Sequence, residues 1–228
     1  MRELLVATKN PGKFREIGEA LLNVGDEGMV ASESRFFELH FLKEFRVDDG
    51  DFVEDGLSFQ ENAEKKARYY YEKFKGVFFG NGVGPEDFFA LGEDSGIMVD
   101  ALDGELGVQT RRWGAGEQAS DQEWIEYFLK RMEDVPEEKR GAKFVCHACV
   151  AGVDASGRFF VEHFFGETKG VITSGLEAPI KEGIPLSSCF RPEGFDRVYA
   201  ALSTEEKNKI SHRGKAMNGV WKFLAGMG

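Results

Sequence analysis

The sequence has few of the features that stabilise small secreted proteins or anchor membrane proteins. Its three cysteines, Cys146, Cys149 and Cys189, cannot all pair within one chain. No stretch approaches the roughly 20 consecutive apolar residues that a membrane-spanning helix needs. The apolar run at residues 4–7 is too short for a signal region and is followed by polar residues. We therefore expect a cytoplasmic protein without a disulfide framework.

Sequence motifs of three familiar site classes are also missing. Residues 8–13 do not form a Walker loop, and no Gly-x-Ser-x-Gly elbow accompanies Ser95, Ser211 and His212. Cys146-x-x-Cys149 has the spacing of metal ligands, but there is no second cysteine pair, and residues 144–153 have the pattern of a buried strand. A structural zinc site is therefore not expected.

Basic residues are in deficit, and the net charge is -11 at pH 7. This argues against a protein that coats DNA or RNA, because polymer binding relies on an extended basic surface. A single nucleotide remains compatible, since a few basic residues and a divalent cation in one cleft can hold it. The length and the lack of a linker predict one domain, residues 1–228, with two lobes around a cleft.

The hydrophobic pattern predicts a mixture of strands and helices without strict alternation. Residues 4–7 form a short strand, 8–13 a loop, and a helix begins at Phe14. The capping-box spacing of Ser58 and Glu61 predicts a helix to about Lys73, followed by a loop at residues 76–84. A strand at 88–91 would then deliver Glu93 and Asp94 at its end. Between residues 25 and 55, short strands and turns are expected rather than a long helix.

The second half continues this α/β pattern. We expect a helix at 121–131 and two strands at 142–153 and 158–165, joined by a hairpin turn at 154–157. A second capping box begins at Ser203, and Ala216, Val220, Phe223 and Leu224 mark a final amphipathic helix.

Thr8, Asn10 and Lys13 lie between the first strand and the first helix. The start of a helix exposes backbone N–H groups, so a hydroxyl, an amide and a lysine there can hold phosphate oxygens. The alternative is a polar turn shaped by Pro11 and Gly12.

Two further clusters carry carboxylates. Glu54 with Lys66 suits Mg²⁺ and a phosphate, although Glu61 and Lys65 nearby have the spacing of a plain surface pair. Glu93 and Asp94, before Ser95 and Gly96, can hold a metal and activate water; the alternative is an acidic turn.

A basic segment at residues 207–213 contains Lys207, Ser211, His212 and Arg213 just before the final helix. A hydroxyl, an imidazole and a guanidinium can contact a nucleobase or a phosphate. Taken alone, the segment could equally be a basic connector between helices.

Read in order, four motifs resemble the inosine/xanthosine triphosphate pyrophosphatase family across almost the whole chain. They are ATKNPGK at 7–13, EDGLSFQENA at 54–63, EDSG at 93–96 and EKNKISHR at 206–213. The resemblance implies an α/β fold with an elongated mixed sheet, flanking helices and a nucleotide cleft between two lobes, usually as a homodimer. It also implies Mg²⁺-dependent hydrolysis of ITP, dITP or XTP to the monophosphate and pyrophosphate.

The resemblance implies a role for each matched residue. The triphosphate would be held by Thr8, Asn10, Lys13 and Lys66. Glu54, Glu93 and Asp94 would lie at the metal, and Asp94 would orient or deprotonate the attacking water. Ser95 would belong to the substrate site, and the nucleoside would be bound by Lys207, Ser211, His212 and Arg213.

One segment departs from the family pattern. The family's Gly-Phe-Gly-Tyr/Trp-Asp-Pro motif corresponds here to residues 183–188, where Leu186 replaces the stacking ring and Ser187 replaces the acid. Two hypotheses follow: an active pyrophosphatase with altered base preference, or a nucleotide-binding protein with weak or no turnover. The retained Glu54, Lys66 and Asp94 favour the enzyme.

Overall fold

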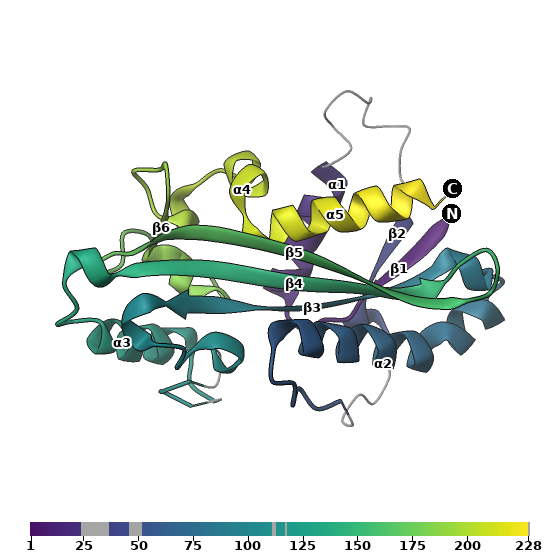
Figure 1. Cartoon of the computed structure of the whole chain (residues 1–228), viewed down its shortest axis with the longest axis horizontal. Coiled ribbons are helices and arrows are strands. Elements are labelled where there is room, and N and C mark those ends of the chain that lie inside the picture. The colour runs from purple at the N-terminus through teal and green to yellow at the C-terminus, as the bar shows by residue number, and fades with distance from the viewer. Residues whose placement is uncertain (24–36, 46–51, 111–112, 117, 228) are drawn as a thin grey trace.

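The computed structural model describes residues 1–23, 37–45, 52–110, 113–116 and 118–227. One six-stranded mixed sheet runs along the elongated molecule, in the order β2-β1-β3-β4-β5-β6 (Figure 1). Its strands are β1 (Arg2–Val6), β2 (Phe37–Phe41), β3 (Phe88–Val99), β4 (Gly141–Val153), β5 (Phe159–Ile172) and β6 (Phe190–Pro192). β1 is parallel to β2 and β3, whereas β3 to β6 are antiparallel. The predicted mixed α/β sheet is confirmed.

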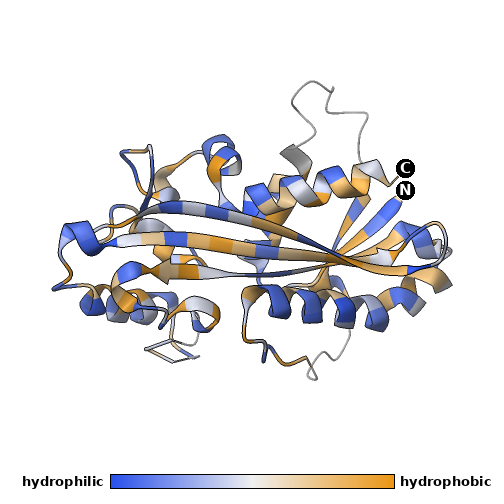
Figure 2. Ribbon diagram, in the orientation of Figure 1, coloured by the Kyte–Doolittle hydropathy of each residue, from blue (hydrophilic) through white to orange (hydrophobic). Residues whose placement is uncertain are grey.

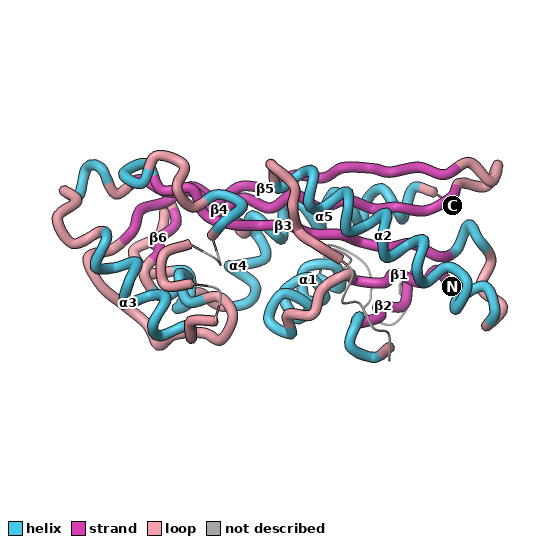
Figure 3. Tube along the Cα trace, turned by 90° about the horizontal axis from the view of Figure 1, so that it is seen from below, coloured by secondary structure: helices cyan, strands magenta, loops and turns pink. Residues whose placement is uncertain are grey.

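Helices cover the sheet from both sides. They are α1 (Pro11–Asn23), α2 (Phe59–Gly80), α3 (Asp121–Arg131), α4 (Thr204–Ile210) and α5 (His212–Gly226). Figure 1 shows α5 above the sheet and α2 below it. Figure 3 shows α3 and β6 at one end of the long axis and β1 and β2 toward the other. None of the described helices has the length and apolar character needed to cross a membrane.

The two faces of β3 pack against different helices. Phe89 and Leu91 lie in a cluster with residues of α1 and α5, whereas Phe88 and Ala90 lie in a cluster with residues of α2. This alternation follows from the two-residue period of a strand. Figure 2 shows hydrophobic and hydrophilic residues interspersed along both the strands and the helices.

Two predicted boundaries were wrong because tertiary packing extends both elements. The helix expected to end near Lys73 continues to Gly80, into the predicted loop, because Phe74 and Phe78 are buried in the same cluster as Phe88. The strand expected to end at Leu91 continues to Val99, paired with β4 over this whole length. Glu93 and Asp94 therefore lie within a strand rather than at its end.

Other predictions are confirmed with shifted ends. α3 has the predicted bounds and begins with a capping box at Ser120. The hairpin turn follows β4 as expected, with Gly157 at φ 79°, but β5 extends beyond Phe165 to Ile172. The short strand expected between residues 25 and 55 is β2, while residues 24–36 and 46–51 lie outside the described part.

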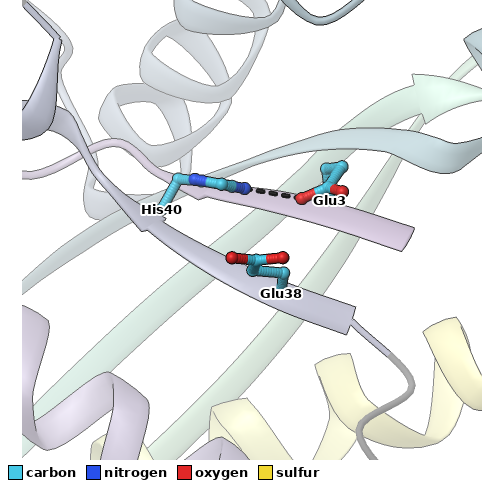
Figure 4. Close-up of side chains that lie close together, drawn as sticks. All are labelled: Glu3, Glu38 and His40. Carbon is cyan, nitrogen blue, oxygen red and sulfur yellow. Dashed lines mark hydrogen bonds and ion pairs between the residues drawn. The ribbon is translucent and has the colours of Figure 1, made fainter. Parts of the chain in front are cut away.

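At the edge of the sheet, Glu3 and Glu38 are direct neighbours on the parallel strands β1 and β2 (Figure 4). The Nε2 atom of His40 lies 2.6 Å from Glu3 Oε2, and ligand-type atoms of all three residues lie within 4.8 Å of one another. The Nδ1 atom of His40 lies 3.9 Å from Glu44, so the imidazole is accounted for by its contacts with Glu3 and Glu44.

Candidate active site

The polar residues gather where β1 ends beside β3. The last ladder contacts pair Val6 with Leu91, and the amide of Ala7 then donates to the carbonyl of Leu91 at 2.9 Å. Beyond this point that edge of β3 is no longer paired with β1. α1 leaves β1 on one face of the sheet, and α2 reaches β3 along the other face. The connections on the two sides of β1 therefore lie on opposite faces of the sheet. Open α/β sheets bind ligands at the carboxyl ends of the strands where such a change of face occurs.

The loop after β1 presents Thr8, Asn10 and Lys13 at the start of α1. The side-chain oxygen of Asn10 accepts hydrogen bonds from the amides of Gly12 at 2.8 Å and Lys13 at 3.1 Å, so Asn10 caps the helix. Pro11 occupies the first helical position, where a missing N–H costs nothing. The Thr8 hydroxyl accepts from the amide of Asn10 at 3.2 Å.

Glu93 lies on the α1 and α5 face of β3 and is 3% exposed. Its carboxylate lies 3.0 Å from Lys13 Nζ and 3.1 Å from Arg213, which also donates to Ser95 Oγ at 2.8 Å. Burial alone would raise its pKa, but the charges of Lys13 and Arg213 hold the pKa of Glu93 well below the usual 4.5. Glu93 is therefore an ionised anchor for two cations.

Asp94 points to the opposite face, toward α2. It is 7% exposed, and its Oδ2 accepts from Asn62 Nδ2 at 2.8 Å, while Oδ1 accepts from the amide of Ser95 at 3.0 Å. Burial raises the pKa of Asp94 above 3.8, against the opposing charges of Lys13 and Lys66. Two adjacent carboxylates thus have pKa values shifted in opposite directions, a pattern typical of divided catalytic roles.

Lys66 connects the loop before α2 to β3. Its Nζ lies 2.7 Å from Glu54 Oε1 and donates to the carbonyl of Glu93 at 3.0 Å. The Lys66 side chain is 8% exposed, whereas that of Glu54 is 44% exposed. Glu54 therefore meets solvent beside Lys66, and its carboxylate is accessible to an incoming cation.

The basic segment lies at a junction between two helices. Ser211 ends α4 and caps α5, accepting from the amide of Gly214 at 2.7 Å. His212 and Arg213 belong to the first turn of α5, not to the loop before it as predicted. A hollow of about 10 Å³ beside this junction, no larger than one water molecule, is lined by Glu16, Glu19, Tyr199, Lys207, Ser211 and Arg213.

His212 is buried behind this junction. Its ring stacks on Phe144, with centroids 5.0 Å apart and planes at 15°. Burial, followed by the charge of Arg213, lowers the pKa of His212 to about 3, so the ring is neutral at pH 7. Its Nδ1 has no hydrogen-bond partner within the described part of the chain.

The second half of the segment that departs from the family pattern, residues 186–188, is packed into the core, whereas Gly183 is exposed. Leu186 is 4% exposed and Ser187 is 2% exposed. Leu186 belongs to the same hydrophobic cluster as Tyr199 and Phe190. Leu186 is thus a core residue, and Tyr199 is the aromatic ring beside the hollow.

Sequence analysis missed two residues that organise the site. Glu16 in α1 contacts both Lys207, at 2.9 Å, and Arg213. Burial opposes its ionisation, but the charges of Arg213 and Lys207 lower the pKa of Glu16 to about 2. Asn62 is 1% exposed and bonded to Asp94. The available signals were the position of Glu16 one turn after Lys13, and a polar Asn62 on the apolar face of its helix.

The chain is similar to known proteins over almost its whole length. The profile of the Ham1 family matches residues 4–223. A dITP/XTP pyrophosphatase of Aquifex aeolicus is 37% identical, with 94% of this chain and 93% of the relative covered. A dITP/XTP pyrophosphatase of Oceanobacillus iheyensis is 32% identical, with 98% of each covered. The Ham1 protein of Staphylococcus aureus has a solved structure with a TM-score of 0.71 and 27% identity, covering 100% of both chains.

Proposed function

The chain belongs to the Ham1 family, and we propose that it hydrolyses non-standard purine nucleoside triphosphates to the monophosphate and pyrophosphate. One observation carries the proposal. Beside the end of β1, the buried carboxylate of Asp94 has a raised pKa and interacts electrostatically with Lys13 and Lys66. A carboxylate beside two phosphate-binding cations is suited to act on a water attacking the α-phosphorus.

The roles of the surrounding residues follow from their positions. Lys13 and Lys66 would bind the triphosphate oxygens and offset the negative charge that develops on the leaving pyrophosphate. The helix start capped by Asn10, together with the Thr8 hydroxyl, would orient the phosphate chain. Asp94 would accept a proton from the attacking water. Ser95, whose hydroxyl accepts a hydrogen bond from Arg213, follows Asp94 in β3 and would complete the substrate site.

The donor set fits a magnesium ion. Glu54 and Asp94 supply hard carboxylate oxygens on the α2 side of β3, and both are near Lys66, whose charge acts on Asp94. Glu93 is the third candidate ligand, and its carboxylate would have to release Lys13 first. When bound, Mg²⁺ would neutralise phosphate charge and polarise water.

The base would be held by residues of the α4–α5 junction. Lys207, Ser211 and Arg213 line the hollow, which would have to widen to admit a base, and the neutral, buried His212 lies between Ser211 and Arg213 in the chain. Donors from Arg213 and His212 match the 6-oxo group of hypoxanthine or xanthine, and polar matching of this kind discriminates strongly between bases. Leu186 is buried in the core, and Tyr199, which lines the hollow, is itself only 3% exposed, so contact between the Tyr199 ring and a base would require the hollow to open.

A second candidate is a nucleotide-binding protein with weak or no turnover. It is favoured by Leu186 and Ser187, which leave the base without the family's stacking ring and acid. We also propose a homodimer, and a cytoplasmic setting that agrees with three buried free cysteines.

The proposal is tested by measuring pyrophosphate release with Mg²⁺ present. The substrates are ITP, dITP, XTP and the four standard ribonucleoside triphosphates. We expect turnover of at least one 6-oxopurine triphosphate at a higher kcat/KM than ATP. Tight nucleotide binding without pyrophosphate release from any of them would establish the second candidate instead. Absence of both binding and release in a folded sample would overturn both.

A further inference from the structure

The side-chain amide of Asn62 binds one hydrogen-bond acceptor and one hydrogen-bond donor. Its Nδ2 donates to Asp94 Oδ2 at 2.8 Å, and its Oδ1 accepts from the backbone amide of Gly56 at 2.8 Å. An ionised carboxylate only accepts and a backbone N–H only donates, so the amide has one satisfied orientation. With 1% of the residue exposed, water cannot replace either partner.

The backbone around Asn62 is shaped to bring these groups together. A Cβ atom on Gly56 would lie 2.3 Å from Asn62 Oδ1, so only glycine allows the loop to approach this closely. A Cβ atom on Gly92 would lie 2.1 Å from the carbonyl oxygen of Ala63, so the second glycine lets α2 press against β3. Both glycines therefore serve a close approach centred on the first turns of α2.

Asn62 thereby connects the two carboxylates on this face. Gly56 lies two residues after Glu54, in the loop before α2, and Glu54 contacts Lys66 one turn beyond Asn62. The other carboxylate oxygen of Asp94 is held by the amide of Ser95. Rotation of the Asp94 carboxylate would break at least one of these bonds.

We propose that Asn62 is a positioning residue that fixes the Asp94 carboxylate and ties it to the loop carrying Glu54. This inference rests on the proposed function and deepens it, since it explains how the reacting carboxylate keeps its orientation when substrate and metal bind. Groups that orient a catalytic or ligating residue typically change activity by about 10- to 100-fold when removed.

The first experiment separates kcat from KM. For Asn62→Ala we expect kcat to fall by about 10- to 100-fold with KM changed by less than about threefold, because substrate contacts remain while Asp94 loses its orientation. Gly56→Ala should give the same split, since it displaces the amide while leaving Asn62 and Asp94 in the chain. Ala63→Gly loosens the same helical turn without touching the amide, and its kcat should stay within about twofold of the unaltered enzyme.

The second experiment needs no activity. Unfolding by urea of Asn62→Ala, Asp94→Ala and the double variant forms a thermodynamic cycle. We expect Asn62→Ala to lower the folding equilibrium constant about tenfold less in the Asp94→Ala background than in the original chain.

The outcomes separate this inference from the proposed function. If the unaltered protein releases no pyrophosphate from any triphosphate, the proposed function fails, and the unfolding cycle alone decides the role of Asn62. Additive effects in that cycle would overturn the inference. If the protein is active, an Asn62→Ala enzyme with unchanged kcat, or one matched by Ala63→Gly, would overturn it as well.

Discussion

The two lysines proposed to bind the triphosphate are both paired with carboxylates proposed to bind metal. Lys66 lies 2.7 Å from Glu54, and Lys13 lies 3.0 Å from Glu93. A cation on the carboxylates would release the lysines for phosphate, so metal and triphosphate should strengthen each other's binding. Glu54→Gln tests the Lys66 part of this coupling. It removes the charge that pairs with Lys66 in the absence of phosphate, and it also removes one of the proposed metal ligands.

The magnitude follows from the exposure of the pair. Two unit charges 4 Å apart interact by roughly 4 kcal/mol at an effective dielectric constant of about 20. The Glu54 side chain is 44% exposed, so solvent screening reduces this to the range of surface pairs, about 0.2 to 1 kcal/mol. Release of Lys66 should therefore tighten metal-free triphosphate binding by up to about fivefold.

Isothermal titration with a triphosphate carrying a methylene bridge between the α and β phosphorus atoms measures this effect. In EDTA, Glu54→Gln should bind more tightly than the unaltered protein, whereas added Mg²⁺ should improve its binding less. Glu72→Gln is the matched control, because it breaks an ion pair of 2.6 Å with Lys75 on the same helix and removes the same charge. Metal-free binding of Glu54→Gln no tighter than that of Glu72→Gln would refute the exchange.

Three further predictions concern the site and its packing. Asp94→Asn should lower kcat by about 10²- to 10⁴-fold while triphosphate still binds, and unchanged turnover would remove Asp94 from the chemistry. The pKa of His212 is about 3 when folded and about 6.5 when unfolded, so its stabilisation is complete above pH 6.5 and is lost as the pH falls toward 3. Between pH 7 and 5, urea unfolding of His212→Phe should therefore depend less on pH than that of the original chain; equal slopes would contradict a buried neutral ring. Gly92→Ala should destabilise the fold by about 2 to 4 kcal/mol, because its methyl group would meet the Ala63 carbonyl at 2.1 Å. Gly76→Ala, which has open space around its Cβ atom, should stabilise α2 by about 0.5 to 1 kcal/mol when measured by the same urea unfolding.

Elements bounded by local chemistry were predictable from the sequence. The predicted caps at Ser58 and Ser203 set the starts of α2 and α4 through hydrogen bonds within a few residues. The capping box at Ser120, which the structure shows before α3, acts in the same way. The ends of α2 and β3 were not predictable in this way. They depend on burial of Phe78 against Phe88 and on pairing with β4, contacts between segments distant in sequence.

The same limit applied to the site. Which residues to examine was predictable, because each matched motif carried polar groups suited to phosphate or metal. Their partners were not: Glu16 meets Arg213 from 197 residues away, and Asn62 meets Asp94 from 32 residues away. Partner choice is set by how α1, α2 and α5 pack on the sheet, which no local pattern encodes.

The boundary error at β3 has a functional consequence. In a turn, Glu93 and Asp94 could share one environment. Within a strand, successive side chains enter opposite faces, so the two carboxylates meet different neighbours. Lys13 and Arg213 contact Glu93 and hold its pKa low, whereas burial raises the pKa of Asp94 against the charges of Lys13 and Lys66 and the hydrogen bond from Asn62. The alternation of one strand thus separates an anchor for cations from a carboxylate with raised basicity, although the two residues are adjacent in the chain.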